Sequence, residues 1–295
     1  MTANVIDGKA IAAGIRDRVS AEVAALRAGG PPPCLAAVLI GDDPAAASYA
    51  RSQARHADGV GMAYRLVELD ATVTLSSAVE AIERLNADPA VSGIMLQLPV
   101  PRSLEALVLQ ETLAPAKDVE GVGPANLGLL AMGREALVPC TAAAAYECLR
   151  STGIDLTGRE AVVVGRSAIV GKPLAMLLLN AHATVTQCHT RTRDLAAQTR
   201  RAEVLVVAAG VAGLIGAEHV RPGAVVIDVG THRIEVEGPD GQCVKKTVGD
   251  VRFDDVSAVA AAITPVPGGV GPVTVAMLLA NTAAACRRSR HDGRS

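Results

Sequence analysis

Aromatic side chains are scarce in this chain of 295 residues, which has three tyrosines, one phenylalanine and no tryptophan. The core must therefore be packed from Val, Leu, Ile and Ala. Hydrophobic residues make up 50% of the chain and charged residues 20%, so the chain can bury a sizeable core and is not disordered. Its length predicts about two domains of ~150 residues each.

An excess of charge of one sign is also missing, because 28 basic residues are balanced by 30 acidic ones, for a net charge of -2. This balance argues against electrostatic binding to nucleic acid or to a membrane surface, and we expect neither partner. No apolar run reaches the ~18 residues of a transmembrane helix. Asp7 and Lys9 lie where a signal peptide would need an apolar stretch, so we expect a cytoplasmic protein.

Paired cysteines of the CxxC type are absent too, which argues against a zinc site and a disulfide framework, so we expect no metal. Free cysteine is usually buried, and we expect structural thiols at all six positions. They are Cys34, Cys140, Cys148, Cys188, Cys243 and Cys286. The basic tail RRSRHDGRS at residues 287–295 is expected to be a frayed, solvated terminus.

Short apolar runs alternate with helical stretches along the whole chain. Such runs, apolar at nearly every position, are typical of parallel strands covered by helices on both faces, and they predict an α/β fold. The expected strands are 34–41, 63–69, 91–98, 161–165, 183–188, 203–210 and 224–230. The expected helices are 9–27, 44–58, 75–87, 141–151, 171–181 and 272–286.

Two segments rich in Gly and Pro predict the domain boundaries. GVGPANLG at 121–128 is followed by VPCT, where Thr141 could cap a new helix, and TPVPGGVGP occupies 264–272. We therefore expect a first domain over 1–125 that also takes in a returning final helix, 270–290, and a second domain over 140–269. A cleft between two such domains is a natural place for a cofactor to meet a substrate.

The second domain opens with a strand, a tight turn and a helix, as a dinucleotide-binding fold does. The free N–H groups at a helix N-terminus can bind phosphate, and Gly165 and Gly171 flank the turn. The pattern is not GxGxxG, because the middle glycine is missing and the spacing is one residue longer. The next expected strand ends without the acid that binds the ribose of NAD. Arg166, Thr190 and Arg191 could hold a 2′-phosphate instead, which predicts NADP, although they could also be solvated surface residues.

Polar residues gather where a ligand would bind the first domain. Tyr49 and Gln53 are four residues apart on one expected helix and so share a face. Gln97 lies at the carboxyl end of a strand, where open α/β sheets bind ligands, and the acids Asp118 and Glu120 follow in KDVEG. Taken singly, each has an ordinary structural explanation.

Together, these segments carry a resemblance. GxxPAxxxY, GIMLQLPVP, KDVEG, PCT, VVVGRSAIVGKP, VIDVG, VGDV and ITPVPGGVGPVTVAMLLANT resemble the bifunctional methylenetetrahydrofolate dehydrogenase/methenyltetrahydrofolate cyclohydrolase family from residue 5 to about 286. The resemblance implies an N-terminal α/β catalytic domain, a Rossmann-type NADP-binding domain, a final helix that rejoins the first domain, and a homodimer. It also implies tetrahydrofolate derivatives as substrates in one-carbon metabolism.

The resemblance also assigns site residues by motif. For the cofactor they are Gly165, Arg166, Ser167, Thr190 and Thr231, with Arg191 added on its charge. For the folate they are Tyr49, Gln97, Asp118, Glu120, Pro265, Gly268 and Gly269, the last three in the PVPGG loop near the reacting carbon. The expected catalytic residues are Tyr49, Gln53, Gln97 and Glu120.

One departure from the family pattern has a chemical meaning, because Gln53 stands where the family has its catalytic lysine. Hydride transfer from folate to nicotinamide needs orientation but no protein base. Addition of water to methenyltetrahydrofolate, followed by C–N cleavage, needs a base and an acid. Gln cannot gain or lose a proton near neutral pH. We therefore expect a dehydrogenase whose cyclohydrolase activity is lost or strongly weakened.

Three other interpretations stay open. The chain could be fully bifunctional and use another base, such as Glu120, which stands where the family has Asp. It could instead bind folate and NADP as a regulatory subunit without turnover. It could also be a dehydrogenase for a different small substrate.

Overall fold

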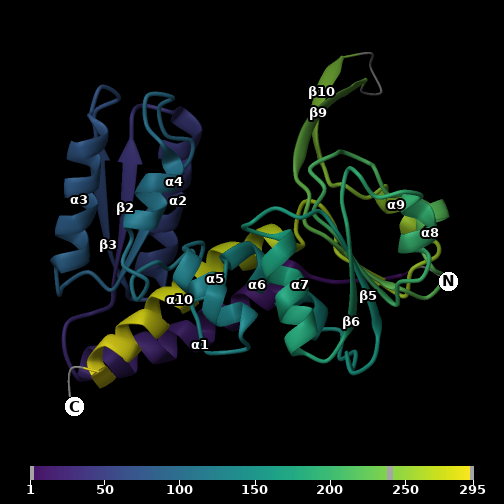
Figure 1. The fold of residues 1–295 in the computed structure, drawn as a ribbon, viewed down its shortest axis with the longest axis horizontal. Helices are drawn as coiled ribbons and strands as arrows, with labels where there is room; N and C mark the ends of the chain where they lie inside the picture. Colours follow the sequence, from purple (N-terminus) through teal and green to yellow (C-terminus); the bar gives the residue numbers. More distant parts are fainter. Residues whose placement is uncertain (1–2, 238–241, 293–295) are drawn as a thin grey trace. The chain divides into compact units, whose positions relative to one another are not determined.

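The structure is a computed structural model that describes residues 3–237 and 242–292 (Figure 1). The chain forms two compact units, named here after their sheets. The three-stranded unit comprises Ala13–Cys140 and the described residues from Val275 onward. The six-stranded unit comprises the described residues up to Ala12 and Thr141–Thr274.

The sheet of the three-stranded unit is parallel and has the order β3-β2-β4. Its strands are β2 (Cys34–Ile40), β3 (Ala63–Leu69) and β4 (Gly93–Leu96). Every residue of β2 is buried, as expected for a central strand that is apolar throughout. A side chain at Gly93 would collide with Val119, since a Cβ there would lie 2.2 Å from Val119 Cγ1. This close approach lets the KDVEG segment pack beside β4.

Among the described residues, six helices lie mostly in this unit. They are α1 (Gly8–Ala28), α2 (Pro44–Gly59), α3 (Leu75–Ala87), α4 (Ala106–Thr112), α5 (Pro124–Ala131) and α10 (Val270–Asp292). Helix α2 begins where Asp43 accepts a hydrogen bond of 2.7 Å from the amide of Ala46. Its buried residues, Ala46, Ala50, Gln53 and Ala57, form one stripe at helical spacing. A single glutamine therefore lies within an otherwise small and apolar face.

The six-stranded sheet is also parallel and has the order β1-β11-β8-β7-β5-β6. Its strands are β1 (Asn4–Val5), β5 (Glu160–Val164), β6 (Thr184–Cys188), β7 (Val204–Val207), β8 (Val225–Asp228) and β11 (Ala262–Ile263). The chain runs outward from β5 to β6 and then crosses to β7. The carboxyl ends of β5 and β7 therefore form a topological switch point, the usual ligand site of a doubly wound sheet.

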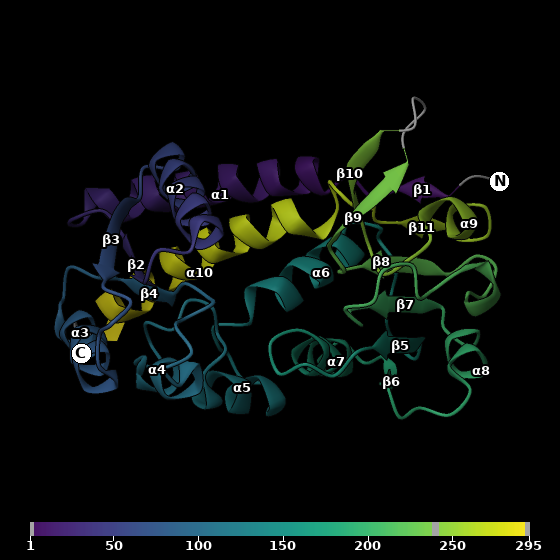
Figure 2. The same ribbon diagram turned by 90° about the horizontal axis from the view of Figure 1, so that it is seen from above.

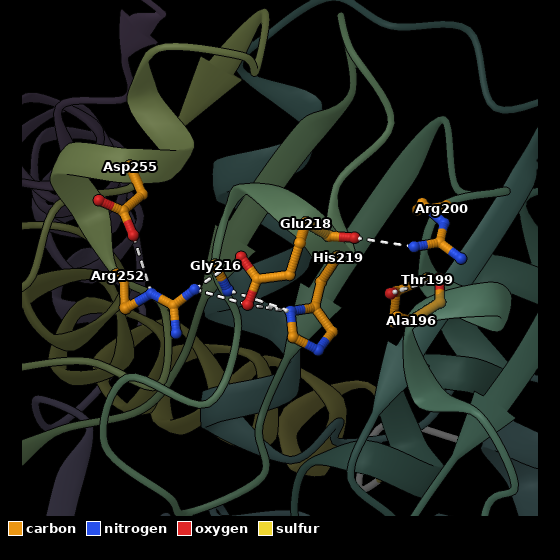
Figure 3. Close-up of polar contacts among 8 residues, drawn as sticks. All are labelled: Ala196, Thr199, Arg200, Gly216, Glu218, His219, Arg252 and Asp255. Carbon is orange, nitrogen blue, oxygen red and sulfur yellow. Dashed lines mark hydrogen bonds and ion pairs between the residues drawn. The ribbon is translucent and has the colours of Figure 1, made fainter.

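Helices cover both faces of this sheet, with α7 on one side and α8 and α9 on the other (Figure 2). The helical elements of the unit are α6 (Cys140–Arg150), α7 (Gly171–Asn180), α8 (Leu195–Thr199), α9 (Phe253–Ser257) and the short 3-10 helix η1 (Ala217–His219). Arg252 joins η1 to α9 by pairing with Glu218 at 2.6 Å and with Asp255 at 2.8 Å (Figure 3).

The structure corrects several expectations about the elements. Residues 121–128 are not all loop, because α5 begins at Pro124. Helix α6 begins at Cys140, so Thr141 lies inside the helix instead of capping it. Strand β1 pairs with β11, which places the N-terminal residues in the six-stranded unit and not in the first domain.

An antiparallel hairpin of β9 (His232–Glu237) and β10 (Cys243–Val248) forms a separate two-stranded sheet that the sequence did not predict. Cys243 lies on this hairpin and is exposed, whereas the other five cysteines are buried as expected.

The basic tail is also not frayed where it is described, because α10 continues to Asp292. Arg287 pairs with Glu22, Arg288 pairs with Glu135 at 2.7 Å, and Arg290 donates to backbone carbonyls near residue 30. Residues 293–295 lie outside the described part of the chain. By length and composition, Val270–His291 could also span a membrane, with mean hydropathy 1.2, contrary to the expectation from apolar runs. A core helix passes the same test, and 56% of its most apolar window is buried within the protein.

Candidate active site

The carboxamide of Gln53 lies at the centre of a buried polar cluster in the three-stranded unit. Its Nε2 donates to the sulfur of Met95 at 2.9 Å. Its Oε1 accepts from Gln97 Nε2 at 2.6 Å and from the Tyr64 hydroxyl at 3.3 Å. Gln53 and Gln97 are each only 1% exposed. The helix residue and the strand-end residue that the sequence analysis singled out are thus in direct contact.

Tyr49 joins this cluster from the same face of α2, one turn before Gln53. Burial raises the pKa of its hydroxyl, while the nearby Gln53 side chain lowers it by less and Cys140 and Glu120 raise it slightly. The ring is nevertheless 39% exposed, so it marks where the cluster meets solvent. Burial also raises the pKa of Tyr64 to about 12, which keeps that hydroxyl a donor.

The two acids of KDVEG have different surroundings. Asp118 is buried, and its carboxylate accepts from the amides of Gly121 at 3.0 Å and Gly123 at 2.7 Å and from Asn126 at 3.3 Å. Its oxygens therefore hold the loop together. Glu120 is partly exposed; burial, and secondly the charge of Asp118, raise its pKa to about 8.

Lys117, the lysine of KDVEG, is committed elsewhere. Its Nζ donates to the carbonyls of Leu85 at 3.1 Å and Asp88 at 2.7 Å, which lie at the C-terminal end of α3. This is a favourable place for a cation, since the last carbonyls of a helix have no partners within it. Lys117 therefore caps α3 and does not provide an ammonium group beside Gln53.

Two buried residues that the sequence analysis did not assign fix the backbone beside Glu120. Cys140 Sγ donates to the carbonyl of Val119 at 3.2 Å, and burial raises the pKa of this thiol well above its usual value. Asn281 of α10 donates to the carbonyls of Val119 at 2.8 Å and Val138 at 2.9 Å. PCT and LLANT were part of the resemblance, but only the tertiary contact shows that both reach the acid loop.

The six-stranded unit places the expected phosphate-binding turn at the end of β5. Gly165 has φ +119, and a Cβ there would lie 2.1 Å from the carbonyl oxygen of Ala208. A Cβ at Gly171 would lie 2.2 Å from the oxygen of Gly165. Ser167 Oγ accepts from the amides of Val170 at 3.2 Å and Gly171 at 3.3 Å, and so orders the start of α7. The turn can hold a phosphate only because both glycines lack side chains.

The residues expected to hold a 2′-phosphate are all exposed on neighbouring strand ends. Arg166 follows β5, while Thr190 and Arg191 follow β6. Within residues 3–237 and 242–292, neither arginine has a carboxylate partner. The first acid after β6, Asp194, caps α8 by accepting from the amide of Ala197 at 3.0 Å. The charge at this edge of the sheet therefore favours an anionic ligand.

Two buried carboxylates support the loops at the ends of β7 and β8. Asp228 accepts from the amides of Gly230, Asp250 and Val251, each at 3.0 Å, and burial raises its pKa to about 6. Asp250 accepts from the amides of Ala209 at 2.6 Å and Gly210 at 2.9 Å, and it lies 2.6 Å from His232 Nε2. Asp228 belongs to the motif VIDVG and Asp250 to VGDV, and the sequence alone assigns neither acid a role.

The PVPGG loop lines a cavity of about 240 Å³ in the six-stranded unit. Thr231, Pro265, Gly268 and Gly269 line it together with Lys9. Gly268 has φ +107, and a Cβ at Gly269 would lie 2.5 Å from the oxygen of Pro265. The loop thus depends on its glycines, and it brings four of the expected site residues to one cavity.

Comparison with known proteins assigns both halves of this arrangement. The model of the tetrahydrofolate dehydrogenase/cyclohydrolase catalytic domain matches residues 6–120, and that of the corresponding NAD(P)-binding domain matches residues 139–290. The chain belongs to the tetrahydrofolate dehydrogenase/cyclohydrolase family. It is 52% identical to bifunctional protein FolD 1 of Rubrobacter xylanophilus over 97% of this chain and 98% of that protein.

Solved structures of the family superpose closely on this fold. FolD of Campylobacter jejuni gives a TM-score of 0.90 at 39% identity, covering 97% of this chain and 99% of that one. FolD of Trypanosoma brucei, solved with NADP and an inhibitor, gives a TM-score of 0.90 at 40% identity, covering 98% and 99%. In this chain, the segment that matches the catalytic domain thus contains Gln53 and Gln97, and the segment that matches the NAD(P)-binding domain contains the turn after β5 and the PVPGG loop.

Proposed function

We propose that this chain oxidises 5,10-methylenetetrahydrofolate to 5,10-methenyltetrahydrofolate with NADP⁺, and that its hydrolysis of the methenyl product is weak or absent. The dehydrogenase activity is supported by membership of the family and by the intact turn and PVPGG loop. The weakness of the second activity rests on one observation. The buried position beside Gln97 and Tyr49 holds the amide of Gln53, which does not titrate.

The hydrogen-bond donors and positive charges at the ends of β5 and β6 suit the phosphates of NADP. Gly165 and Ser167 would leave the α7 N-terminus open to the pyrophosphate, and Arg166, Thr190 and Arg191 would hold the 2′-phosphate. Thr231 and the PVPGG loop would line the nicotinamide side. When bound, NADP⁺ accepts the hydride at nicotinamide C4. An NADP-binding Rossmann-type domain requires nothing more of these residues than binding and orientation.

For the folate, we propose that Tyr49 and Gln97 orient the pteridine and its one-carbon unit and that Glu120 contacts the ring. We also propose that the folate contacts Pro265, Gly268 and Gly269. Loss of hydride needs no base, because both electrons of one C–H bond leave with the hydrogen and the carbon remains as a cation shared with two nitrogens. The amide at position 53 does not impair this step.

Hydrolysis makes a different demand. A water oxygen must lose a proton as it attacks the methenyl carbon, and a ring nitrogen must gain one as its bond to that carbon breaks. Gln53 can do neither, and Lys117 is held by the carbonyls of α3. Loss of a general acid–base group typically lowers a rate by ~10²–10⁴-fold.

The test measures both half-reactions on one purified preparation. Hydride transfer is followed as NADPH formation from methylenetetrahydrofolate, and hydrolysis as loss of methenyltetrahydrofolate without nicotinamide, against the buffer rate. Gln53→Lys should raise hydrolysis by at least ~10²-fold. Gln53→Met, similar in length but without a proton to exchange, is the matched control and should leave hydrolysis at the buffer rate. Rapid hydrolysis by the unmodified chain would refute the second half of the proposal, and no hydride transfer would refute the first.

One observation favours a second candidate, a fully bifunctional enzyme that uses Glu120. With a pKa raised to about 8, this carboxyl is largely protonated at neutral pH and becomes a base only in alkaline solution. Hydrolysis driven by Glu120 as base should therefore rise with pH through about 8 and disappear in Glu120→Gln. Hydrolysis that is present but independent of Glu120 would exclude this candidate.

The assembly and location of the protein are also proposals. We propose a homodimer in the cytoplasm that binds neither nucleic acid nor membranes, acting in the one-carbon metabolism that supplies purine biosynthesis. The hairpin of β9 and β10 supports the dimer. Within the described residues its sheet has two strands, so both edges can pair with another chain, and Val244 on it is 49% exposed. Sedimentation at several concentrations should give twice the chain mass of 30.1 kDa, and a monomer would overturn the assignment.

A further inference from the structure

The sulfur of Met95 determines how the two glutamine side chains are oriented. A thioether accepts hydrogen bonds but cannot donate them. The group of Gln53 that faces this sulfur at 2.9 Å must therefore be its NH₂. The carbonyl oxygen of Gln53 then faces the opposite way, toward Tyr64 and Gln97.

The orientation passes from Gln53 to Gln97. The Gln53 oxygen can only accept, so the edge of Gln97 that lies 2.6 Å away must be its NH₂. The Tyr64 hydroxyl donates to the same oxygen at 3.3 Å and reinforces this arrangement. The amide of Gln97 is consequently turned with its own oxygen, Oε1, on the edge away from Gln53.

Gln97 as a whole is only 1% exposed, so little of this oxygen meets solvent. None of the described residues donates a hydrogen bond to Gln97 Oε1. Yet across residues 3–237 and 242–292 no buried side-chain nitrogen or oxygen lacks a partner, so this oxygen is not sealed off. It lies at the carboxyl end of β4, directly before Leu98, which is 47% exposed. An acceptor is therefore presented at the open side of the cluster.

Resting on the proposed function, we propose that Met95 and Tyr64 are positioning residues that hold the Gln97 carbonyl oxygen toward the one-carbon unit of the bound folate. Tyr64 acts through Gln53, whereas Met95 acts both through Gln53 and by its own contact of 3.8 Å with Gln97 Nε2. During oxidation one C–H bond breaks, its electron pair leaves with the hydrogen to C4 of NADP⁺, and the carbon becomes a methenyl cation. The negative end of a fixed carbonyl dipole stabilises that developing charge more than it stabilises the neutral methylene substrate. The amide at position 53 thereby serves hydride transfer, the step that it does not impair.

The orientation can be measured without turnover. Nuclear Overhauser effects from the side-chain NH₂ of ¹⁵N-labelled glutamine in the full-length protein report which group faces which neighbour. We expect the Gln53 NH₂ protons to contact the Met95 methyl group, and the contact to vanish in Met95→Leu. Contact of these protons with the Tyr64 ring in place of Met95 would mean that both amides are reversed, and would overturn the inference even if the enzyme is active.

Kinetics test the consequence through a double-mutant cycle. Gln97→Leu removes the carbonyl oxygen that Met95 is proposed to orient, so kcat for hydride transfer should fall at least ~10-fold. Met95→Leu alone should cost about 2- to 5-fold, because Gln53 becomes free to rotate. In the double variant Met95 has no Gln97 oxygen left to orient, so kcat should equal that of Gln97→Leu within about 2-fold.

Additive losses in this cycle would show that Met95 only fills space, and would refute the positioning role. Met132→Leu, a change of the same kind at a residue 70% exposed, should leave kcat unchanged. Tyr64→Phe should lower kcat and leave KM for NADP⁺ unaltered. If the unmodified protein transfers no hydride, the proposed function fails, while the resonance experiment still decides the orientation.

Discussion

The carboxylate of Asp228 occupies the space that a side chain at Gly249 would need. A Cβ at Gly249 would lie 1.8 Å from Asp228 Oδ2, while Asp228 itself binds three backbone amides. The acid cannot move aside without leaving those amides unpaired. The motifs VIDVG and VGDV therefore depend on each other. The carboxylate of Asp228 in the first motif fits only because Gly249 in the second has no side chain.

Gly249→Ala should consequently destabilise the protein strongly, by about 3 kcal/mol or more, because the methyl group displaces a buried hydrogen-bonded carboxylate. Denaturant titration gives the free energy of unfolding. Gly128→Ala is the control, since nothing lies within 4 Å of the Cβ there and the residue is inside helix α5. It should gain about 0.5–1 kcal/mol. Equal effects of the two substitutions would contradict the close approach.

The stability of the protein should fall as the pH rises from about 5 to about 8. Glu120, whose ordinary pKa is 4.5, keeps its proton to about pH 8 when folded, and Asp228 keeps its proton to about pH 6. In that window the folded state binds protons that the unfolded chain has released, so the free energy of unfolding decreases with pH. The limiting slope is ~1.4 kcal/mol per pH unit for one group, and the partial exposure of Glu120 reduces it.

Glu120→Gln removes the larger of these two contributions. Relative to the unmodified protein, the variant should therefore gain stability as the pH rises toward 8, measured as the midpoint of thermal unfolding at a series of pH values. Glu83→Gln, on the exposed side of α3, should run parallel to the unmodified protein. A constant offset between Glu120→Gln and the unmodified protein across the series would contradict the raised pKa.

Preference for NADP⁺ should depend on the arginines after β5 and β6. Arg191→Ala and Arg166→Ala should each lower kcat/KM for NADP⁺ by about 10- to 100-fold and leave kcat/KM for NAD⁺ within about 3-fold, because only NADP⁺ carries the 2′-phosphate. Arg193→Ala, another exposed arginine after β6, is the control and should change neither value. Equal losses with both cofactors would mean that the arginines contact another part of the dinucleotide.

The elements that the sequence predicts correctly are those that depend on residues close together in the chain. The helix expected over 44–58 is present as α2, and the uninterrupted apolar run predicted β2. The sequence also placed Tyr49 and Gln53 one turn apart on a single helix, and α2 contains both. These features need only neighbours in sequence.

What the sequence did not predict depends on tertiary contact. The sequence identifies Tyr64 only as a residue of a strand. Its contact with Gln53, eleven positions earlier, depends on the parallel pairing of β3 with β2. The difference between Asp118 and Glu120 could not be predicted either, because it depends on which backbone amides the loop turns inward. Asn281 is more than 160 positions away from the carbonyl that it binds.

Asn281 offers the sharpest test of how the last helix supports the acid loop. Its NH₂ group binds the carbonyls of Val119 and Val138, and the residue is 8% exposed. Asn281→Leu would leave both carbonyls unpaired in the interior and should cost about 2–4 kcal/mol of unfolding free energy. Because Val119 directly precedes Glu120, KM for methylenetetrahydrofolate should rise as well, while KM for NADP⁺ stays unchanged. Arg287→Ala, which removes an exposed ion pair from the same helix, should cost at most ~1 kcal/mol and alter neither KM. A stability loss in Asn281→Leu with no change in the folate KM would show that the helix supports the fold without positioning the acid.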